Sequence, residues 1–327
     1  MEINKRVFFT CLLIILMVFA GGCSPPAELP ADAAGTASLW VTRDFGAEDI
    51  FCSEVPVTPN QSVMELLKEH LDVETEYGGG FVNAINGFES GYSGKTGEER
   101  RKVDWFYYVN GILSDEGPAE YVPADGDVIW WDYRPWGEIA FTPAVVGAFP
   151  QPFSGGYGGK TRDTLILAGE GCDKWAGQLA GFLEEAGAKS VEVVPYSETA
   201  ASNRSQMVLV VALWEQLCGS PFWEGIQQHR DRTGWFAELT PGRFYPLDEH
   251  ALRQNEGFGE KTGAVLATAA GLGDPHPLWL VTATDPEGLA GLVNALVENP
   301  GQFEKKVGAL VVHGKVLGLP QTAGSGE

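Results

Sequence analysis

The feature that most constrains the fold of this chain is a series of continuous apolar segments in its second half. A strand forms an unbroken apolar run when both faces of its sheet are buried, as in parallel sheets covered by helices. Such runs occupy residues 164–168, 207–213, 264–268, 278–282 and 307–312, and a further strand is expected at 191–194. Apolar residues at helical spacing fill 172–186, 221–230 and 286–298. Residues 163–320 are therefore predicted to form a three-layer α/β domain with a mostly parallel sheet.

The first half of the chain has a different pattern, in which short strands alternate with turn signals. Two strands around Asp44-Phe45-Gly46 predict a hairpin, and residues 63–70 have a polar start and one apolar face, which indicates a short helix. Further strands are expected at 81–85, 103–109 and 128–133, next to Asn-Gly or Asp-Gly-Asp turns. One helix among several strands predicts a sheet wrapped on a helix, an α+β arrangement.

The order of the motifs in this half resembles a known family. The blocks are Ser62-Val63-x-x-Leu66-Leu67, Gly80-Phe81-Val82-x-x-Ile85-x-Gly87, Trp105-Phe106-Tyr107-Tyr108-Val109-Asn110-Gly111, and Tyr121 followed by Gly126-Asp127-Val128-Ile129. Over residues 38–136 they look like the transcobalamin-like C-terminal domain, a β-grasp module also named DUF4430. In vertebrate vitamin B12 carriers this domain closes over the corrinoid against a separate helical barrel. No such barrel is recognised here, so the resemblance implies a ligand-binding module and leaves the ligand open.

The N-terminus has the layout of a secretory signal. Lys5 and Arg6 precede an apolar run over residues 7–20, and Gly21-Gly22-Cys23 follows. The run is shorter than the roughly 20 residues that span a bilayer. The ending resembles a bacterial lipobox, although Ala20 stands where leucine is more frequent. Residues 1–22 are predicted to be a lipoprotein signal, with Cys23 lipidated; an ordinary secretory signal is the alternative.

The segments between these units are predicted to be connections. Residues 23–37 are rich in proline and alanine and have no periodic apolar face, as expected of a tether. Residues 137–162 are rich in glycine and proline and are assigned as a linker or crossover, and 321–327 as a tail. Val145, Val146 and Phe149 predict that the crossover packs against other parts of the protein.

Composition limits the partners of the protein. The formal net charge of −22 argues against binding to nucleic acid or to an anionic membrane surface, since both require positive charge. A lipid on Cys23 would hold the protein at the outer face of the cell membrane, in the bacterial cell envelope. Cys52, Cys172 and Cys218 are far apart in the sequence, and no pairing among them is assigned.

Motifs for catalysis or for a resident cofactor are weak. Gly169-x-Gly171 opens a helix, but Lys174 replaces the third glycine of a dinucleotide fingerprint. The five histidines have no metal-ligand spacing, and no G-x-S-x-G motif occurs. Cys172 at a helix start is expected to be packed under the helix. The chain is therefore predicted to be no enzyme, with no metal and no cofactor.

Aromatic side chains form the most suggestive pattern. Alternate residues of a strand share a face, so Trp105 and Tyr107 share one face, as do Trp131 and Tyr133. A small sheet with one helix buries only one face, so one aromatic set is expected to be partly exposed, and exposed aromatic patches mark binding surfaces. Packing against the linker or the second domain is the alternative. The candidate ligand-binding residues are Tyr92, Trp105, Tyr107, Asn110, Trp131, Tyr133 and Trp136.

These observations predict a membrane-tethered, extracytoplasmic binding lipoprotein. Its first domain would recognise a small molecule or a partner, and the resemblance suggests cobalamin or another corrinoid, passed to a membrane transporter. Two alternatives remain open. One is a structural or adhesive cell-envelope protein with the aromatic residues at an interdomain contact. The other is an enzyme with its site at the strand ends of the second domain.

Overall fold

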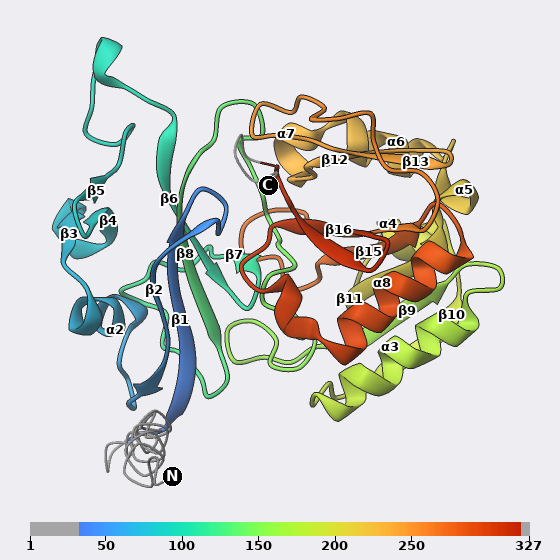
Figure 1. Ribbon diagram of the computed structural model, residues 1–327. Coiled ribbons are helices and arrows are strands. Elements are labelled where there is room, and N and C mark those ends of the chain that lie inside the picture. Colours follow the sequence, from blue (N-terminus) through green and yellow to red (C-terminus); the bar gives the residue numbers. More distant parts are fainter. Residues whose placement is uncertain (1–32, 322–327) are drawn as a thin grey trace, which may run out of the picture.

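The computed structural model describes residues 33–321 and has a mixed α/β fold with several sheets (Figure 1). Its two largest sheets lie face to face, one from each half of the chain. The predicted signal and tether, including Cys23, lie almost entirely outside the described residues, as does most of the predicted tail. No helix within 33–321 is long and apolar enough to cross a membrane.

The N-terminal half is built on a five-stranded sheet with the order β2-β1-β8-β6-β7. Its first two strands form the predicted antiparallel hairpin, and β1 also pairs in parallel with β8 at its centre. The hairpin turn holds Asp44, Phe45 and Gly46 at φ of 56°, 62° and 80°. The strands are β1 (Gly35–Arg43), β2 (Glu48–Val57), β6 (Val103–Val109), β7 (Ile112–Leu113) and β8 (Val128–Pro135).

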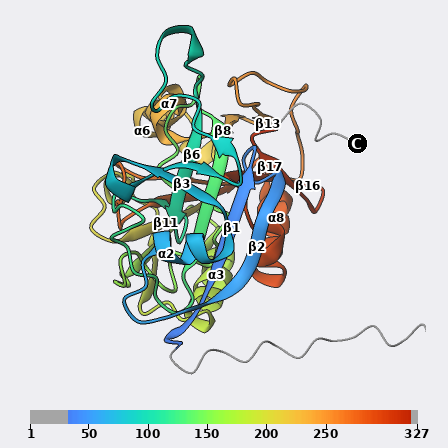
Figure 2. The same ribbon diagram turned by 90° about the vertical axis from the view of Figure 1, so that its left-hand side faces the viewer.

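One face of this sheet is covered by helix α2 (Val63–His70) and a three-stranded sheet (Figure 2). The helix begins where predicted, because Ser62 accepts from the N–H of Glu65 while the Glu65 side chain accepts from the N–H of Ser62. The small sheet has the order β3-β4-β5. Its parts are β3 (Val73–Glu76), η1 (Tyr77–Gly79), β4 (Phe81–Ile85) and β5 (Phe88–Glu89); η2 (Gly97–Glu99) lies in the following loop.

The C-terminal half is built on a seven-stranded sheet with the order β10-β9-β11-β15-β14-β16-β17. The strands are β9 (Thr164–Ala168), β10 (Val191–Pro195), β11 (Met207–Leu213), β14 (Thr262–Thr268), β15 (Leu278–Ala283), β16 (Gly308–Val312) and β17 (Lys315–Leu319). All residues of β11, β14 and β15 are buried, as their apolar runs predicted.

The prediction of a mostly parallel sheet is only half right. The pairings from β10 through β9 and β11 to β15 are parallel, whereas those from β15 through β14 and β16 to β17 are antiparallel. An apolar run reports burial on both faces and carries no information on strand direction. Within the antiparallel part, only β16 and β17 form a tight hairpin, which turns at His313-Gly314.

Both faces of the seven-stranded sheet are covered. Helices α3 (Asp173–Glu185) and α8 (Pro286–Glu298) pack on one face, together with η3 (Pro300–Phe303). The other face contacts the five-stranded sheet and a group of short elements rich in buried tryptophan. These are α4 (Glu198–Ser202), α5 (Trp214–Leu217), α6 (Pro221–Gln228), α7 (Arg230–Thr233), β12 (Ala237–Thr240) and β13 (Arg243–Pro246).

The crossover between the halves is buried, as its apolar residues predicted. Val145 and Val146 are fully buried, and Phe149 is 7% exposed. The rings of Phe149 and Phe153 pack against Trp279 of β15 at 5.7 and 5.1 Å between centroids. The crossover therefore helps to join the two halves into one packed body.

Candidate functional site

The leading candidate site is a groove of about 370 Å³ along the outer edge of β6. Residues 105–107 of β6, 80–82 at the start of β4 and 113–118 after β7 form most of its lining. Trp131 of β8, Phe141 of the crossover and Leu272 of the C-terminal half complete it. The groove thus lies where both halves of the chain meet, and we refer to it as the β6 groove.

The β6 groove exists because β7 is too short to cover the edge of β6. In the antiparallel register, the main-chain N–H and C=O groups of the even-numbered residues of β6 point toward β8, as does the N–H of Asn110. The main-chain groups of Trp105 and Tyr107 therefore point away from β8, toward the outer edge of the sheet. On this outer side, Ser114 N–H donates to the Tyr107 carbonyl at 3.0 Å, and Gly91 N–H donates to the Val103 carbonyl at 2.8 Å. Between these bonds, no segment within residues 33–321 pairs with the main chain of Trp105. The edge of β6 is open there.

Aromatic rings form the floor of the groove. Tyr107 and Trp131 stack with centroids 4.7 Å apart and an interplanar angle of 15°. They are 8% and 3% exposed, whereas Trp105 is only half-buried. Trp105 is fixed by its indole N–H, which donates to the Phe88 carbonyl at 2.8 Å. The rings are thus held rigidly before any ligand enters.

Two buried polar atoms of these rings lack hydrogen bonds. Within the described part of the chain, the Tyr107 hydroxyl and the Trp131 indole N–H have no partner of good geometry. Burial raises the pKa of Tyr107 well above its usual value, with smaller contributions from Tyr121 and Tyr157, while the nearby Ser114 acts to lower it. Tyr107 therefore stays a neutral hydrogen-bond donor at any physiological pH.

The rim of the groove is acidic. Asp115 and Glu116 are exposed, and Asp115 is oriented by the Tyr157 hydroxyl, which donates to its Oδ1 at 2.7 Å. The lining contains no Lys, Arg or His. The opposite wall is held by Gly273 N–H, which donates to the Leu113 carbonyl at 2.8 Å and brings Leu272, 50% exposed, to the rim. An apolar floor with an acidic rim favours a ligand that is partly apolar and carries positive charge.

Of the sequence-predicted residues, Trp105, Tyr107 and Trp131 line the groove. Tyr133 lies beside Trp105, with centroids 5.1 Å apart, but its hydroxyl donates to the Glu89 carbonyl at 2.7 Å and it is not part of the lining. Its role is to hold β5 on the sheet.

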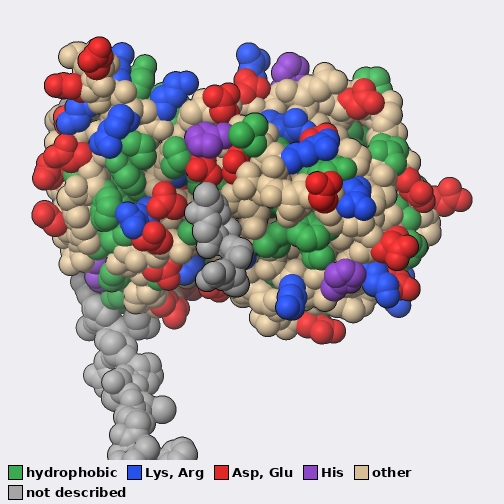
Figure 3. All heavy atoms as spheres, turned by 45° about the horizontal axis from the view of Figure 1, so that its top comes forward, with side chains coloured by type: hydrophobic (Ala, Val, Ile, Leu, Met, Phe, Trp, Pro, Cys, Tyr) green, Lys and Arg blue, Asp and Glu red, His purple; other side chains and the backbone are tan. Residues whose placement is uncertain are grey.

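Tyr92 and Trp136 form a separate pair at the base of the loop between β5 and β6. Their rings meet edge to face at 5.0 Å, and Arg100 and Lys102 lie over them at 4.6 and 5.6 Å. The end of the molecule that carries this loop shows both acidic and basic side chains (Figure 3). This pair does not join the groove.

Asn110 was predicted to bind a ligand, but its side chain holds a turn. It is buried at φ of 52°, and its side-chain amide donates to Asp127 Oδ1 at 2.7 Å and to the Gly156 carbonyl at 2.9 Å. Its Oδ1 accepts from the N–H of Val128 at 2.8 Å. All of these bonds hold the turn after β6, outside the groove. The Asn-Gly signal that placed a turn here also explains the residue.

The other aromatic face of the five-stranded sheet is buried against the C-terminal half. Tyr108 and Trp130 are 0% and 1% exposed, and Phe45 packs on Phe236 at 5.2 Å between centroids. Trp105 on the opposite face is half-buried, whereas the alternative expectation, packing against the second domain, describes this face. A second sheet covers it, a contact between distant segments that strand periodicity does not encode.

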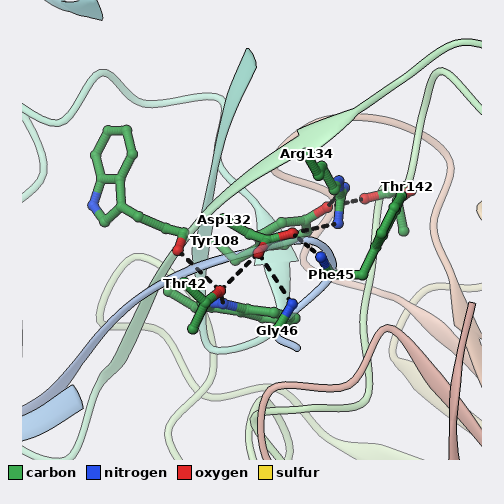
Figure 4. A network of polar contacts seen from close by, with 9 residues as sticks. Thr42, Phe45, Gly46, Tyr108, Asp132, Arg134 and Thr142 are labelled. Carbon is green, nitrogen blue, oxygen red and sulfur yellow. Dashed lines mark hydrogen bonds and ion pairs between the residues drawn. The ribbon is translucent and has the colours of Figure 1, made fainter. Parts of the chain in front are cut away.

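A buried polar network lies at this contact and was not predicted (Figure 4). Asp132 accepts from the Thr42 hydroxyl at 2.7 Å and from the N–H groups of Phe45 and Gly46 at 3.1 Å each. Arg134 lies 3.7 Å from Asp132. Asp132 and Arg134 share a strand face with Trp130, and the strand pattern does not show that this face is covered.

Arg134 connects this network to the crossover. It donates to the Tyr108 hydroxyl, which donates in turn to the Thr142 carbonyl at 3.0 Å. The guanidinium also lies 4.4 Å from the Phe106 ring centroid. Burial raises the pKa of Asp132, opposed by the charge of Arg134 and the hydrogen bond from Thr42. The network is buried, and its bonds join β1, β6, β8 and the crossover to one another.

An exposed glutamine lies beyond two strand ends of the C-terminal half. Gln216 donates to the Glu170 carbonyl at 2.9 Å and accepts from Leu213 N–H at 3.3 Å, beyond the carboxyl ends of β9 and β11. A Cβ on Gly169 would come within 2.2 Å of Gln216 Oε1. The glycine loop therefore serves close packing at this place.

The cysteines and possible metal ligands show no reactive arrangement. Cys52, Cys172 and Cys218 are free thiols. Burial raises the pKa of Cys172 in spite of its place at a helix start. Within residues 33–321, no group of three or more His, Cys, Asp or Glu side chains is placed to hold a metal ion.

One comparison with known proteins matches part of the N-terminal half. The family model described as "Domain of unknown function (DUF4430)" matches residues 60–134. A search of curated proteins gave no match. The matched segment runs from before α2 almost to the end of β8 and leaves β1 and β2 outside. All groove residues except Phe141 and Leu272 lie within it. Residues 60–134 of this chain are therefore a DUF4430 domain.

Proposed function

We propose that this protein is a membrane-tethered, extracytoplasmic binding protein that holds its ligand in the β6 groove. The observation that carries the proposal is an aromatic floor next to an acidic rim, in a groove of about 370 Å³. This volume lies in the usual range of sites for small molecules, which are mostly apolar with a few placed polar groups. None of its lining side chains forms a nucleophile–base pair, so binding without chemistry is the simplest role.

The ligand is expected to carry a flat or apolar part and a positive charge. Rings such as Trp105 and Tyr107 attract cations and stack on planar groups, and Asp115 and Glu116 add a favourable field. A corrinoid remains the specific candidate from the family resemblance. A complete corrinoid is larger than the groove, so only one edge of its ring system would enter.

The proposed layout is a β-grasp domain followed by an α/β domain. The parallel pairing of β1 with β8, with α2 crossing one face of their sheet, supports the first part. Helices on one face of the seven-stranded sheet and mixed elements on the other support the second. The α/β domain then serves as the support that completes the groove wall at Leu272.

The tether is proposed to be a lipid on Cys23. Changing Cys23 to Ser removes the acyl acceptor, so the protein should move from the membrane fraction to the medium, which immunoblotting of both fractions measures. Changing the exposed Cys52 to Ser is the matched control and should leave it in the membrane fraction. If the Cys23→Ser variant stays in the membrane fraction, the lipid anchor is wrong, whereas the proposal of a binding function is unaffected.

Binding is tested by titrating the purified protein with cobalamin and with a library of small cationic aromatic compounds, followed by tryptophan fluorescence. At least one compound should quench the signal at micromolar concentration, and Leu272→Arg should weaken its binding at least tenfold by repelling a cation at the rim. Leu252→Arg is the matched control, since Leu252 is 61% exposed and outside the groove. Equal affinity of the Leu272→Arg and Leu252→Arg variants for the compound would mean that it binds outside the groove. No change of fluorescence on titration with cobalamin would exclude a corrinoid as the ligand.

A structural role in the cell envelope is the second candidate. The burial of Tyr108 and Trp130 between the halves favours this role, because these aromatic residues hold the two halves together and are not available to bind a ligand.

A further inference from the structure

The β6 groove runs along a strand edge and not across a sheet face. Alternate residues of a strand point to opposite faces, yet the groove is lined by three consecutive residues, Trp105, Phe106 and Tyr107. Only a ligand that lies beside the strand contacts side chains of both faces at once. This geometry places the ligand level with the main chain of β6.

The edge offers unpaired main-chain groups at that level. Trp105 directs its N–H and C=O outward, and Tyr107 directs its N–H outward, beyond the reach of β7. Ser114 and Gly91 close the edge on either side of this gap. A free strand edge of this kind is the template to which an extended chain adds by main-chain hydrogen bonds.

The surroundings select the composition of the added chain. Phe106, Phe141 and Leu272 form an apolar wall on one side of the edge, and Trp105, Tyr107 and Trp131 lie on the other. Asp115 and Glu116 stand at the rim, with no basic residue in the lining to balance them. Alternating apolar side chains would enter the two walls, and a basic residue would meet the two carboxylates.

We propose that the β6 groove binds a short extended peptide segment of another protein, apolar and basic in composition, which adds as a strand to the open edge of β6. This inference rests on the proposed binding function and narrows its ligand to a polypeptide. The main-chain groups of Trp105 and Tyr107 provide the register, and the walls and the acidic rim provide the selectivity. A free small molecule would use the aromatic floor but leave these main-chain groups unpaired.

The test selects a random heptapeptide library on the purified full-length protein and, in parallel, on its Leu272→Arg variant. Peptides enriched only on the unchanged protein should combine Lys or Arg with alternating apolar residues. The tightest peptide is then synthesised with one N-methylated amide at a time. Methylation at one or two central, alternating positions should weaken binding about tenfold, since each removes a main-chain hydrogen bond and crowds the edge.

Two further readouts locate the peptide. Its binding should slow hydrogen exchange of the Trp105 and Tyr107 amides, measured by NMR. Glu116→Gln should weaken binding about threefold at low salt, whereas Glu120→Gln, an exposed acid outside the groove lining, should not. These two variants differ only in whether the lost charge faces the groove.

Three outcomes overturn the inference. The first is that the unchanged protein enriches no peptides beyond those that the Leu272→Arg variant enriches. The others are that N-methylation at no position weakens peptide binding, and that peptide binding leaves the hydrogen exchange of the Trp105 amide unchanged. If a small molecule still binds in the groove, the proposed function stands and the peptide ligand is wrong. If neither peptide nor small molecule binds there, both proposals fail.

Discussion

Asp132 is a fully buried carboxylate that accepts hydrogen bonds from one hydroxyl and two main-chain N–H groups. Its neighbour Arg134 is 2% exposed, and its Nη1 makes no hydrogen bond within the described residues. A buried ion pair adds little net stability compared with apolar residues, but loss of one partner leaves the other charge buried without compensation. The pair therefore makes the packing around β1 and β8 sensitive to single substitutions.

Asp132→Asn should lower the free energy of unfolding by about 3–5 kcal/mol, because Arg134 then stays buried without a counter-charge. Urea denaturation followed by circular dichroism measures the loss. Asp231→Asn, at an exposed position, should change stability by less than about 0.5 kcal/mol. The double change of Asp132→Asn with Arg134→Met should recover part of the loss. A single variant as stable as the unchanged protein would show that the pair is not needed for the fold.

At this scale, the sequence predicted which residues share a strand face but not what covers each face. The spacing correctly grouped Trp105 with Tyr107, and Trp131 with Tyr133. The burial of Trp130 and the role of Asp132 depend on a second sheet that is distant in the sequence. Local periodicity holds no information on such a contact.

Elements with a strong local signal were predicted to the residue, whether helix or strand: the predicted strands 103–109 and 207–213 match β6 and β11. Residues 63–70 and 286–298 match α2 and α8 to the residue, through a capping box at Ser62 and a cap with a following proline at Asp285. The strands β5 and β7 have two residues each and were not predicted. Such short strands are defined by their hydrogen-bonding partners and not by their own sequence. Because the open edge of β6 results from the shortness of β7, the sequence did not predict this edge either.

Asp285→Ala should lower the free energy of unfolding by about 1 kcal/mol at pH 7, because Asp285 accepts from the N–H of Gly288 and caps α8. Burial acts to raise the pKa of Asp285, but hydrogen bonds from Gly288 and Lys261 lower it overall. A lowered pKa in the folded state stabilises the protein above the unfolded value of about 3.9, and this stabilisation disappears as the pH falls through the folded value.

The difference between the unchanged protein and Asp285→Ala should therefore narrow below about pH 4. Urea unfolding at a series of pH values measures it. Glu192→Gln, on an exposed position of β10, serves as the control and should show no such pH-dependent difference. A constant difference across the pH range would mean that the cap acts without its charge.

The two halves of the molecule share one core, because Tyr108 and Trp130 of one sheet lie in the same apolar cluster as Val210 and Leu280 of the other. The change in sequence pattern along the chain predicted two units. The apolar residues of the crossover predicted that the crossover packs against other parts of the protein. The size of the contact between the units was not predictable, since both of its surfaces look like ordinary strands. Their mutual fit is a property of three-dimensional shape.

Trp130→Ala should destabilise both sheets together, by about 3–5 kcal/mol, since it removes a large buried side chain at their contact. Tryptophan fluorescence and far-ultraviolet circular dichroism should then show a single, coincident transition at lower urea. Trp136→Ala, just after the end of β8 and only partly buried, is the matched control and should cost less than half as much. Two separate transitions in the unchanged protein would show that the halves unfold independently.

The placement of β1 has a mechanical consequence. It is the first strand of the described chain, and it lies between β2 and β8, with hydrogen bonds to both along its length. These bonds run perpendicular to the strand. A force applied through the N-terminal segment along the direction of β1 therefore loads many of them at once, in shear, and does not open them one by one. The folded part of the chain is therefore expected to resist unfolding by a force applied from its N-terminal side.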